Sequence, residues 1–171
     1  MRGVMCALWL LMATAQAGTP RLDLGIGALT ARRATSSATT PAIGLAASTP
    51  VVSLLEVRAD TAISTFVEEN TAGRLDRTVW RSAVTADLVT TRQSVSLRLG
   101  LGPAIEVQPV YVAGAGEWSG TRVLLGGRAH LGLSGAITSR IGWRGGVGAT
   151  LTLDGPGYDA LGGVTLALGQ P

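Results

Sequence analysis

An alternation of apolar and polar residues between Thr121 and Leu153 is the feature that most constrains how this chain can fold. Every charged residue of this stretch falls on an even position, and the odd positions are mainly apolar or small. A period of two predicts β-strands with one apolar and one polar face, whereas a helix would need a period near 3.6. Soluble strands average about five to six residues and membrane-spanning strands need roughly nine to eleven, so the long alternation favours strands that cross a bilayer.

Composition supports a membrane or secreted protein with one domain. The chain has 171 residues, of which only 15% are charged, and it contains no lysine. A soluble domain usually has about 25% charged residues. No segment approaches the run of about eighteen apolar residues that a membrane-spanning helix requires.

The first 17 residues predict a Sec-type signal peptide. Arg2 precedes an apolar core over residues 4–13, and Ala15-Gln16-Ala17 is a small-x-small cleavage site. Cleavage after Ala17 leaves residues 18–171 as a single barrel domain. It also removes Cys6, the only cysteine, which excludes disulfides and cysteine metal ligands from the mature protein. The mature charge of +2 gives no reason to expect nucleic acid as a partner.

The alternation predicts an all-β chain with an even number of strands. Residues 32–49, rich in Ala, Ser, Thr and Pro, are expected to form a long extracellular loop that could contact a surface ligand. Gly102-Pro103-Ala104 is expected to be a tight connection, Pro109 a bulge, and Asp60-Thr61 a turn or a kink. We expect eight strands, or ten if the two longest both break: 21–31, 50–68, 78–90, 93–101, 105–111, 121–133, 137–153 and 158–168.

The signal peptide, the alternating strands and the short turns on one side resemble the small outer-membrane barrels of the outer-membrane protein A and X type. The resemblance covers roughly Arg21 to Leu168 and concerns architecture only, so it assigns no functional residue. It implies a closed antiparallel up-and-down transmembrane β-barrel in the outer membrane, with lipid as its surroundings. The chain departs from these barrels in its last strand, which ends in Leu168 instead of an aromatic residue, and in its low aromatic content of 4%.

The polar faces of the strands predict a charged barrel interior. We interpret this set as an arginine–carboxylate network that fills a narrow barrel, because eight strands leave an interior just wide enough for side chains. The alternative is a narrow porin-like channel with a slight anion preference, because inward arginines outnumber inward acids. The predicted interior residues are Asp23, Glu56, Arg58, Arg81, Asp87, Arg98, Glu106, Arg122, Arg128, His130, Arg140 and Arg144.

A thin belt of aromatic residues is expected at the membrane interfaces. It consists of Trp80, Tyr111, Trp118, Trp143 and Tyr158.

The sequence gives no indication of catalysis, a cofactor or a metal site. His130 is the only histidine, and its inward position in mid-strand predicts a paired structural residue. The expected function is a non-enzymatic outer-membrane barrel with a structural or surface-interaction role. A third possibility, a soluble secreted or periplasmic barrel that binds an apolar ligand, would require the apolar faces to point inward. The oligomeric state does not follow from the sequence.

Overall fold

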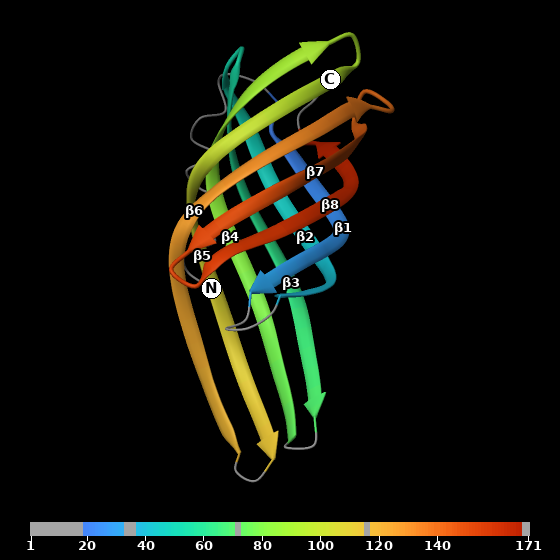
Figure 1. Cartoon of the computed structure of the whole chain (residues 1–171). Coiled ribbons are helices and arrows are strands. Elements are labelled where there is room, and N and C mark those ends of the chain that lie inside the picture. The colour runs from blue at the N-terminus through green and yellow to red at the C-terminus, as the bar shows by residue number, and fades with distance from the viewer. Residues whose placement is uncertain (1–18, 33–36, 71–72, 115–116, 169–171) are drawn as a thin grey trace.

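The computed structural model describes residues 19–32, 37–70, 73–114 and 117–168, so the predicted signal peptide lies outside the described residues. Each strand pairs in antiparallel fashion with the next one in sequence, and the last pairs with the first to close a barrel (Figure 1). The predicted eight-stranded up-and-down barrel is therefore confirmed. The strands are β1 (Arg21–Arg32), β2 (Ser37–Val52), β3 (Leu55–Asn70), β4 (Gly73–Arg92), β5 (Val95–Gly114), β6 (Trp118–Ala136), β7 (Ile141–Thr152) and β8 (Gly155–Ala167).

Among the described residues, no helix has the length and apolar character needed to cross a membrane.

The expected loop over residues 32–49 is wrong, because most of it forms β2, paired with β1 from Arg32↔Ser37 to Arg21↔Ser48. The inward positions of β2 are small, and at Gly44 a side chain from β8 fills the adjacent space: a Cβ there would lie 2.6 Å from Leu161 Cδ1. A strand with so few large side chains has the composition of a loop, and this hid it. Of the segment 32–49, residues 33–36 lie outside the described residues.

The expected connection at residues 102–104 is also wrong, because β5 runs through it without a turn. Pro103 and Pro109 both lie inside β5 and each interrupts its pairing with β4, since proline has no N–H to donate. The register is the same on both sides of each proline, with Trp80↔Val107 and Arg77↔Val110, so the expected bulge at Pro109 is absent.

These two errors cancel in the strand count: one strand was missed and one was divided. The turn that ends β2 lies at Ser53-Leu54, and Asp60-Thr61 lies inside β3. The turn between β6 and β7 occupies residues 137–140, so β6 continues through the predicted break at 134–136.

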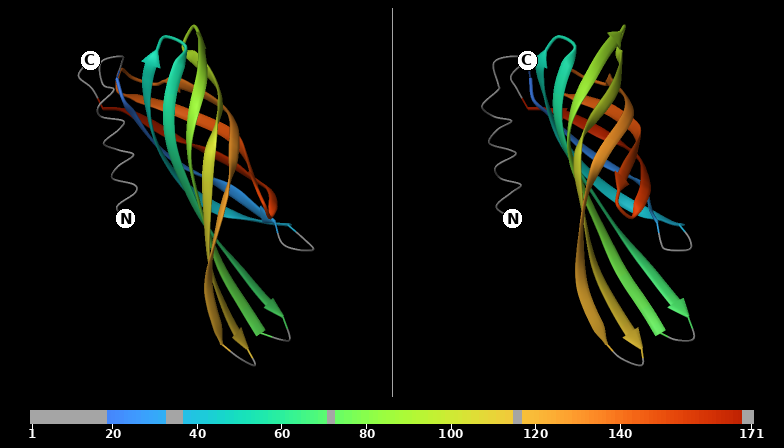
Figure 2. Two further views of the ribbon diagram at one scale, coloured as in Figure 1. Left: turned by 90° about the vertical axis from the view of Figure 1, so that its left-hand side faces the viewer. Right: turned by 60° about the vertical axis from the view of Figure 1, so that its left-hand side comes forward.

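The barrel has two unlike ends. Pro20 accepts a hydrogen bond from the Leu168 backbone N–H, so both ends of the described chain lie together, beside the turns that follow β2, β4 and β6. We call this the terminal end. At the opposite end β3, β4, β5 and β6 extend well beyond the other strands as a four-stranded sheet (Figures 1 and 2).

The outside of the barrel is apolar and the inside is polar. Ile26, Leu101 and Leu125 are 72%, 63% and 71% exposed, whereas most buried side chains are charged or hydroxylated. A soluble barrel with an apolar interior would have the reverse arrangement, so the third possibility is wrong. The outer face instead matches the lipid-facing band of a membrane barrel.

Candidate functional site

The barrel interior brings together most of the charged residues predicted for it. Alternate residues of each strand point inward, so every strand contributes side chains to the same space. Nine of the twelve predicted residues are buried, and Arg144 is nearly so, with its side chain 12% exposed. The nine are Asp23, Glu56, Arg58, Arg81, Asp87, Arg98, Glu106, Arg128 and His130.

Arg122 and Arg140 do not lie in the interior. Arg122 belongs to the part of β6 that extends past β7, where its guanidinium donates to Asp154 at 2.9 Å in an exposed pair. Arg140 lies in the turn between β6 and β7 and is exposed. The alternation placed both inward because it cannot show where the barrel wall ends.

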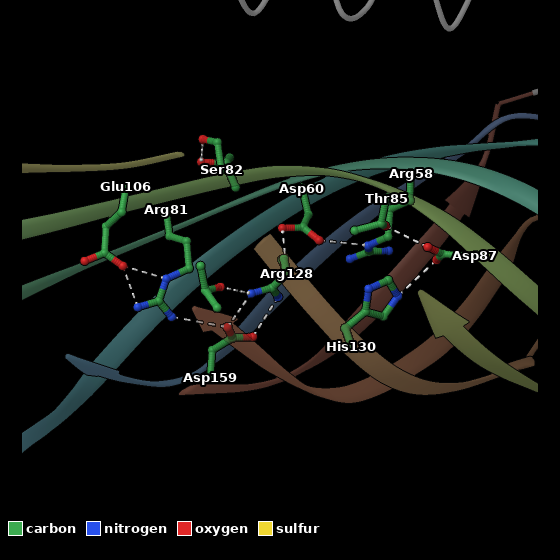
Figure 3. A network of polar contacts seen from close by, with 12 residues as sticks. Arg58, Asp60, Arg81, Ser82, Thr85, Asp87, Glu106, Arg128, His130 and Asp159 are labelled. Atoms are coloured by element: carbon green, nitrogen blue, oxygen red, sulfur yellow. Dashed lines mark hydrogen bonds and ion pairs between the residues drawn. The ribbon is translucent and has the colours of Figure 1, made fainter. Parts of the chain in front are cut away.

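Asp159 is the centre of the network and lies between two arginines (Figure 3). It accepts hydrogen bonds from Arg128 at 2.6 and 2.9 Å and from Arg81 at 3.4 Å. Arg81 also donates two hydrogen bonds to Glu106, at 2.8 and 2.7 Å. Glu106 accepts another from Gln108.

The network continues from Arg128 toward the terminal end. Arg128 forms an ion pair with Asp60 at 3.4 Å, and Asp60 accepts a hydrogen bond from Arg58 at 3.3 Å. Arg58 donates to Asp23 at 2.6 Å, and Asp23 also accepts from Arg144. Charged side chains from β1, β3, β4, β5, β6, β7 and β8 thus form one connected chain of ion pairs.

Asp60 and Asp159 were not in the predicted set although both are central to it. Asp60 belongs to the expected turn or kink at Asp60-Thr61, and Asp159 is the second residue of the expected last strand, 158–168. With them, the ion-pair network and the neighbouring buried pairs comprise five arginines and six carboxylates, so these charges show no arginine excess of the kind expected for anion preference. The arginines are Arg58, Arg81, Arg98, Arg128 and Arg144, and the carboxylates are Asp23, Glu56, Asp60, Asp87, Glu106 and Asp159.

Glycines leave the space that the long side chains occupy. A Cβ at Gly157 would lie 2.3 Å from the Arg81 guanidinium, and one at Gly148 would lie 2.6 Å from that of Arg128. Both contacts are far inside van der Waals distance. The glycine positions are therefore part of how the sequence encodes this interior.

His130 forms a separate buried pair with Asp87, with 3.0 Å between Nε2 and Oδ2. Thr85 donates to the other carboxylate oxygen of Asp87 at 2.7 Å. In a catalytic triad the histidine lies between the hydroxyl and the carboxylate, but here the carboxylate lies between the other two. The arrangement orients a structural histidine and activates no nucleophile. Among the described residues, no group of three His, Cys, Asp or Glu side chains could hold a metal ion.

An apolar cluster fills the interior on the side of the network toward the four-stranded sheet. It consists of buried side chains from β1 to β4, and Leu161 of β8 packs against it. The Arg77 guanidinium lies over the Phe66 ring, 5.3 Å from its centroid. The cluster residues are Leu29, Ala42, Ala62, Phe66 and Val79.

The projecting sheet has two edges without a neighbouring strand. The pairing of β3 with β2 ends at Ile63, and the pairing of β6 with β7 extends only from Gly126 to Ala136. Arg74, near the tip of β4, binds Asp76 at 2.9 Å and Glu69 at 3.3 Å. The hydrogen bond that the exposed Arg74 guanidinium donates to Asp76 raises the pKa of Arg74 above its usual value.

The five predicted interface aromatics are all exposed, but they do not form one belt. Trp80 faces outward on β4, where its indole N–H donates to Thr61 at 2.5 Å. Trp143 lies near the terminal end and Tyr158 lies toward the other end of the wall, near the start of β8. Tyr111 and Trp118 lie in the projecting sheet, and Trp118 shares with Arg122 the face that continues the barrel interior.

These features define a small closed β-barrel of the outer-membrane type, with a filled interior and a projecting sheet. The sequence matches no family model and no curated protein sequence. The fold is similar to the solved structures of three outer-membrane barrels.

Neisserial surface protein A matches with a TM-score of 0.70 at 15% identity, over 88% of this chain and 99% of that one. Ail, the attachment invasion locus protein of Yersinia pestis, matches with a TM-score of 0.67 at 14% identity over the same shares, in a structure with the heparin analogue sucrose octasulfate. The N-terminal barrel domain of Pseudomonas aeruginosa OprF matches with a TM-score of 0.58 at 11% identity, over 88% of this chain and 97% of that domain. At these identities the similarity establishes the fold, which confirms the resemblance to small outer-membrane barrels.

Proposed function

We propose that this chain is an integral outer-membrane barrel, exported by a signal peptide at residues 1–17, that serves as a surface-interaction protein and not as an enzyme. The observation that carries the proposal is that the fold has two structurally different parts. A barrel whose interior is closed by paired charges carries a four-stranded sheet beyond its wall (Figure 2). The filled barrel is suited to anchoring, and the sheet is suited to contact with a partner.

The proposed orientation follows from the strand number. An even number of strands places both ends of the described chain at the terminal end, with the turns at 53–54, 93–94 and 137–140. Bacterial barrels have short periplasmic turns and longer extracellular segments. The sheet of β3 to β6 would then project from the cell surface.

The free edges of the sheet indicate how it could bind a partner. Unpaired strand edges present backbone N–H and C=O groups that an extended segment of another chain can pair with. The described edges are residues 65–70 of β3 and residues 118–125 of β6. They replace the segment 32–49 as the proposed contact for a surface partner.

A narrow channel has less support. The cavity within the charged network is about 50 Å³, and it is bordered by the paired side chains of Asp23, Arg58, Arg128 and Asp159. The apolar cluster around Phe66 adds a second closure beyond it.

The orientation can be tested with single cysteines, because removal of the signal peptide leaves the mature chain without a thiol. Ser119→Cys lies near the tip of β6, and Ser94→Cys lies in a turn at the terminal end; both serines are exposed. On intact cells, a membrane-impermeant maleimide should label the first variant and leave the second unlabelled until the outer membrane is permeabilised. Labelling only at Ser94→Cys would indicate the opposite orientation, with the terminal end outside the cell. Recovery of the unlabelled native protein in the soluble periplasmic fraction would refute membrane insertion.

A further inference from the structure

A polar cavity of about 440 Å³ opens at the terminal end of the barrel. We call it the terminal mouth. It is bordered by the start of the described chain at Thr19 and Arg21, by the turn after β4, by the turn between β6 and β7, and by the ends of β6 and β8. Its volume falls within the range of about 300–1,000 Å³ that is usual for small-molecule sites.

The lining of the terminal mouth is rich in hydroxyl groups and contains no carboxylate. Ser94 and Ser139 contribute exposed hydroxyls from the two turns, and Gln93 contributes an amide. Ser96 and Ser134 contribute hydroxyls from the inner faces of β5 and β6, where Ser96 also forms a hydrogen bond with Thr91 and Ser134 also accepts one from Arg98. Hydroxyls and amides both donate and accept hydrogen bonds, so this lining can pair with the hydroxyl and acetamido groups of a sugar.

Two arginines give the terminal mouth a positive charge. The side chain of Arg21 is 40% exposed, and its nearest carboxylate, Glu56, lies 3.9 Å away and already accepts a hydrogen bond from Arg98 at 3.3 Å. Arg140 is exposed, and no ion pair involves it within the described part of the chain. These guanidiniums are therefore available to an anionic group, which they bind with strong and often bidentate hydrogen bonds.

We propose that the terminal mouth binds an acidic amino-sugar glycan, in which a carboxylate contacts Arg21 and Arg140 and the sugar contacts the hydroxyl lining. The proposal rests on the orientation above, which makes the terminal mouth face the periplasm and the cell wall. An anionic lipid fits less well, because part of the hydroxyl lining comes from the inner faces of the strands. The acyl chains of a lipid held there would have to pass through the barrel wall.

The experiment measures binding by isothermal titration calorimetry to the folded barrel in neutral detergent. The probe is the disaccharide N-acetylglucosaminyl-N-acetylmuramic acid, and the uncharged comparator is di-N-acetylchitobiose. We expect saturable binding of the acidic disaccharide and about tenfold weaker binding of the neutral one, as expected for loss of a charge-assisted hydrogen bond. Equal binding of the two sugars, or no binding of either, would overturn the proposal.

The double substitution Arg21→Gln with Arg140→Gln should weaken binding of the acidic disaccharide by about tenfold or more. Arg92→Gln is the matched control, because Arg92 is exposed at the same end but does not border the terminal mouth. Equal loss in the control would indicate non-specific attraction and overturn the site. Specific binding to phosphatidylglycerol vesicles in place of the disaccharide would overturn the glycan assignment. The binding assay does not depend on the cysteine labelling, so failure of the orientation and failure of the site are distinguishable.

Discussion

Arg128 on β6 and Asp159 on β8 form two hydrogen bonds, of 2.6 and 2.9 Å, in the barrel interior although β7 separates their strands. Arg81 on β4 reaches the same carboxylate at 3.4 Å. These side-chain ion pairs cross the barrel interior and connect strands that share no backbone hydrogen bonds. They tie β4, β6 and β8 together, and they explain why the interior needs charges at these positions.

Removal of the Asp159 charge should strongly destabilise the barrel. Asp159→Asn leaves two buried guanidiniums without their shared carboxylate, and breaking a buried ion pair in this way costs about 3–5 kcal/mol. The free energy of unfolding in urea, measured after reconstitution in lipid vesicles, checks this value.

Asp154→Asn is the matched control for this prediction. Asp154 forms an exposed pair with Arg122, and such pairs contribute only about 0–1 kcal/mol. Similar losses in the two variants would contradict the central role of Asp159.

Gly100 is predicted to be required as glycine. A Cβ at this position would lie 2.3 Å from both Asp87 Oδ1 and His130 Cε1, so Gly100→Ala must displace the buried pair. We expect a loss of about 1–3 kcal/mol in the free energy of unfolding, as for other overpacked cores.

Gly145→Ala provides the comparison, because a Cβ at Gly145 meets no heavy atom within 4 Å. This variant should be as stable as the native protein or slightly more stable, since alanine restricts the unfolded chain. A destabilised Gly145→Ala together with an unaffected Gly100→Ala would show that the interior is arranged differently.

The sequence predicted the β-strands, their apolar and polar faces and most of the interior charged residues, because a period of two is a local property of each strand. Pairing geometry was harder to predict. The composition of β2 predicted a loop because its inward positions are small. At Gly44 the side chain that fills the adjacent space, Leu161, lies about 120 residues away along the chain. Pro103 and Pro109 predicted a turn and a bulge, because proline cannot donate a ladder hydrogen bond. In the structure β5 loses these hydrogen bonds at both prolines but keeps its register, which the sequence does not show.

The interior charged residues were also predicted only in part. The alternation placed Arg122 and Arg140 inside because they have the right parity, but only the register with β7 shows that the wall does not enclose them. Asp159 has inward parity too, and its importance becomes visible only when Arg81 and Arg128 are seen to converge on it.

The native barrel should not conduct ions. The interior charges are paired with one another, the cavity among them is about 50 Å³, and the Phe66 cluster closes the space beyond. Planar-bilayer recordings of the purified protein should therefore show no current steps of constant amplitude. The same sample must show a heat-dependent mobility shift on SDS gels, which establishes that the barrel is folded. Reproducible steps from such a sample would favour the channel interpretation.

Shortening the projecting sheet should leave the barrel folded. Replacement of residues 68–75 by Asn-Gly connects Val67 to Asp76, and replacement of residues 112–118 by Asn-Gly connects Tyr111 to Ser119. Both are cross-strand pairs, which a two-residue Asn-Gly turn can connect. The ion-pair network and the Phe66 cluster lie outside the replaced segments. The variant with both replacements should keep its heat-dependent mobility shift, and its free energy of unfolding should fall far less than that of Asp159→Asn. Loss of the mobility shift would mean that the projecting sheet is needed to fold the barrel, which would contradict its proposed role as a separate interaction surface.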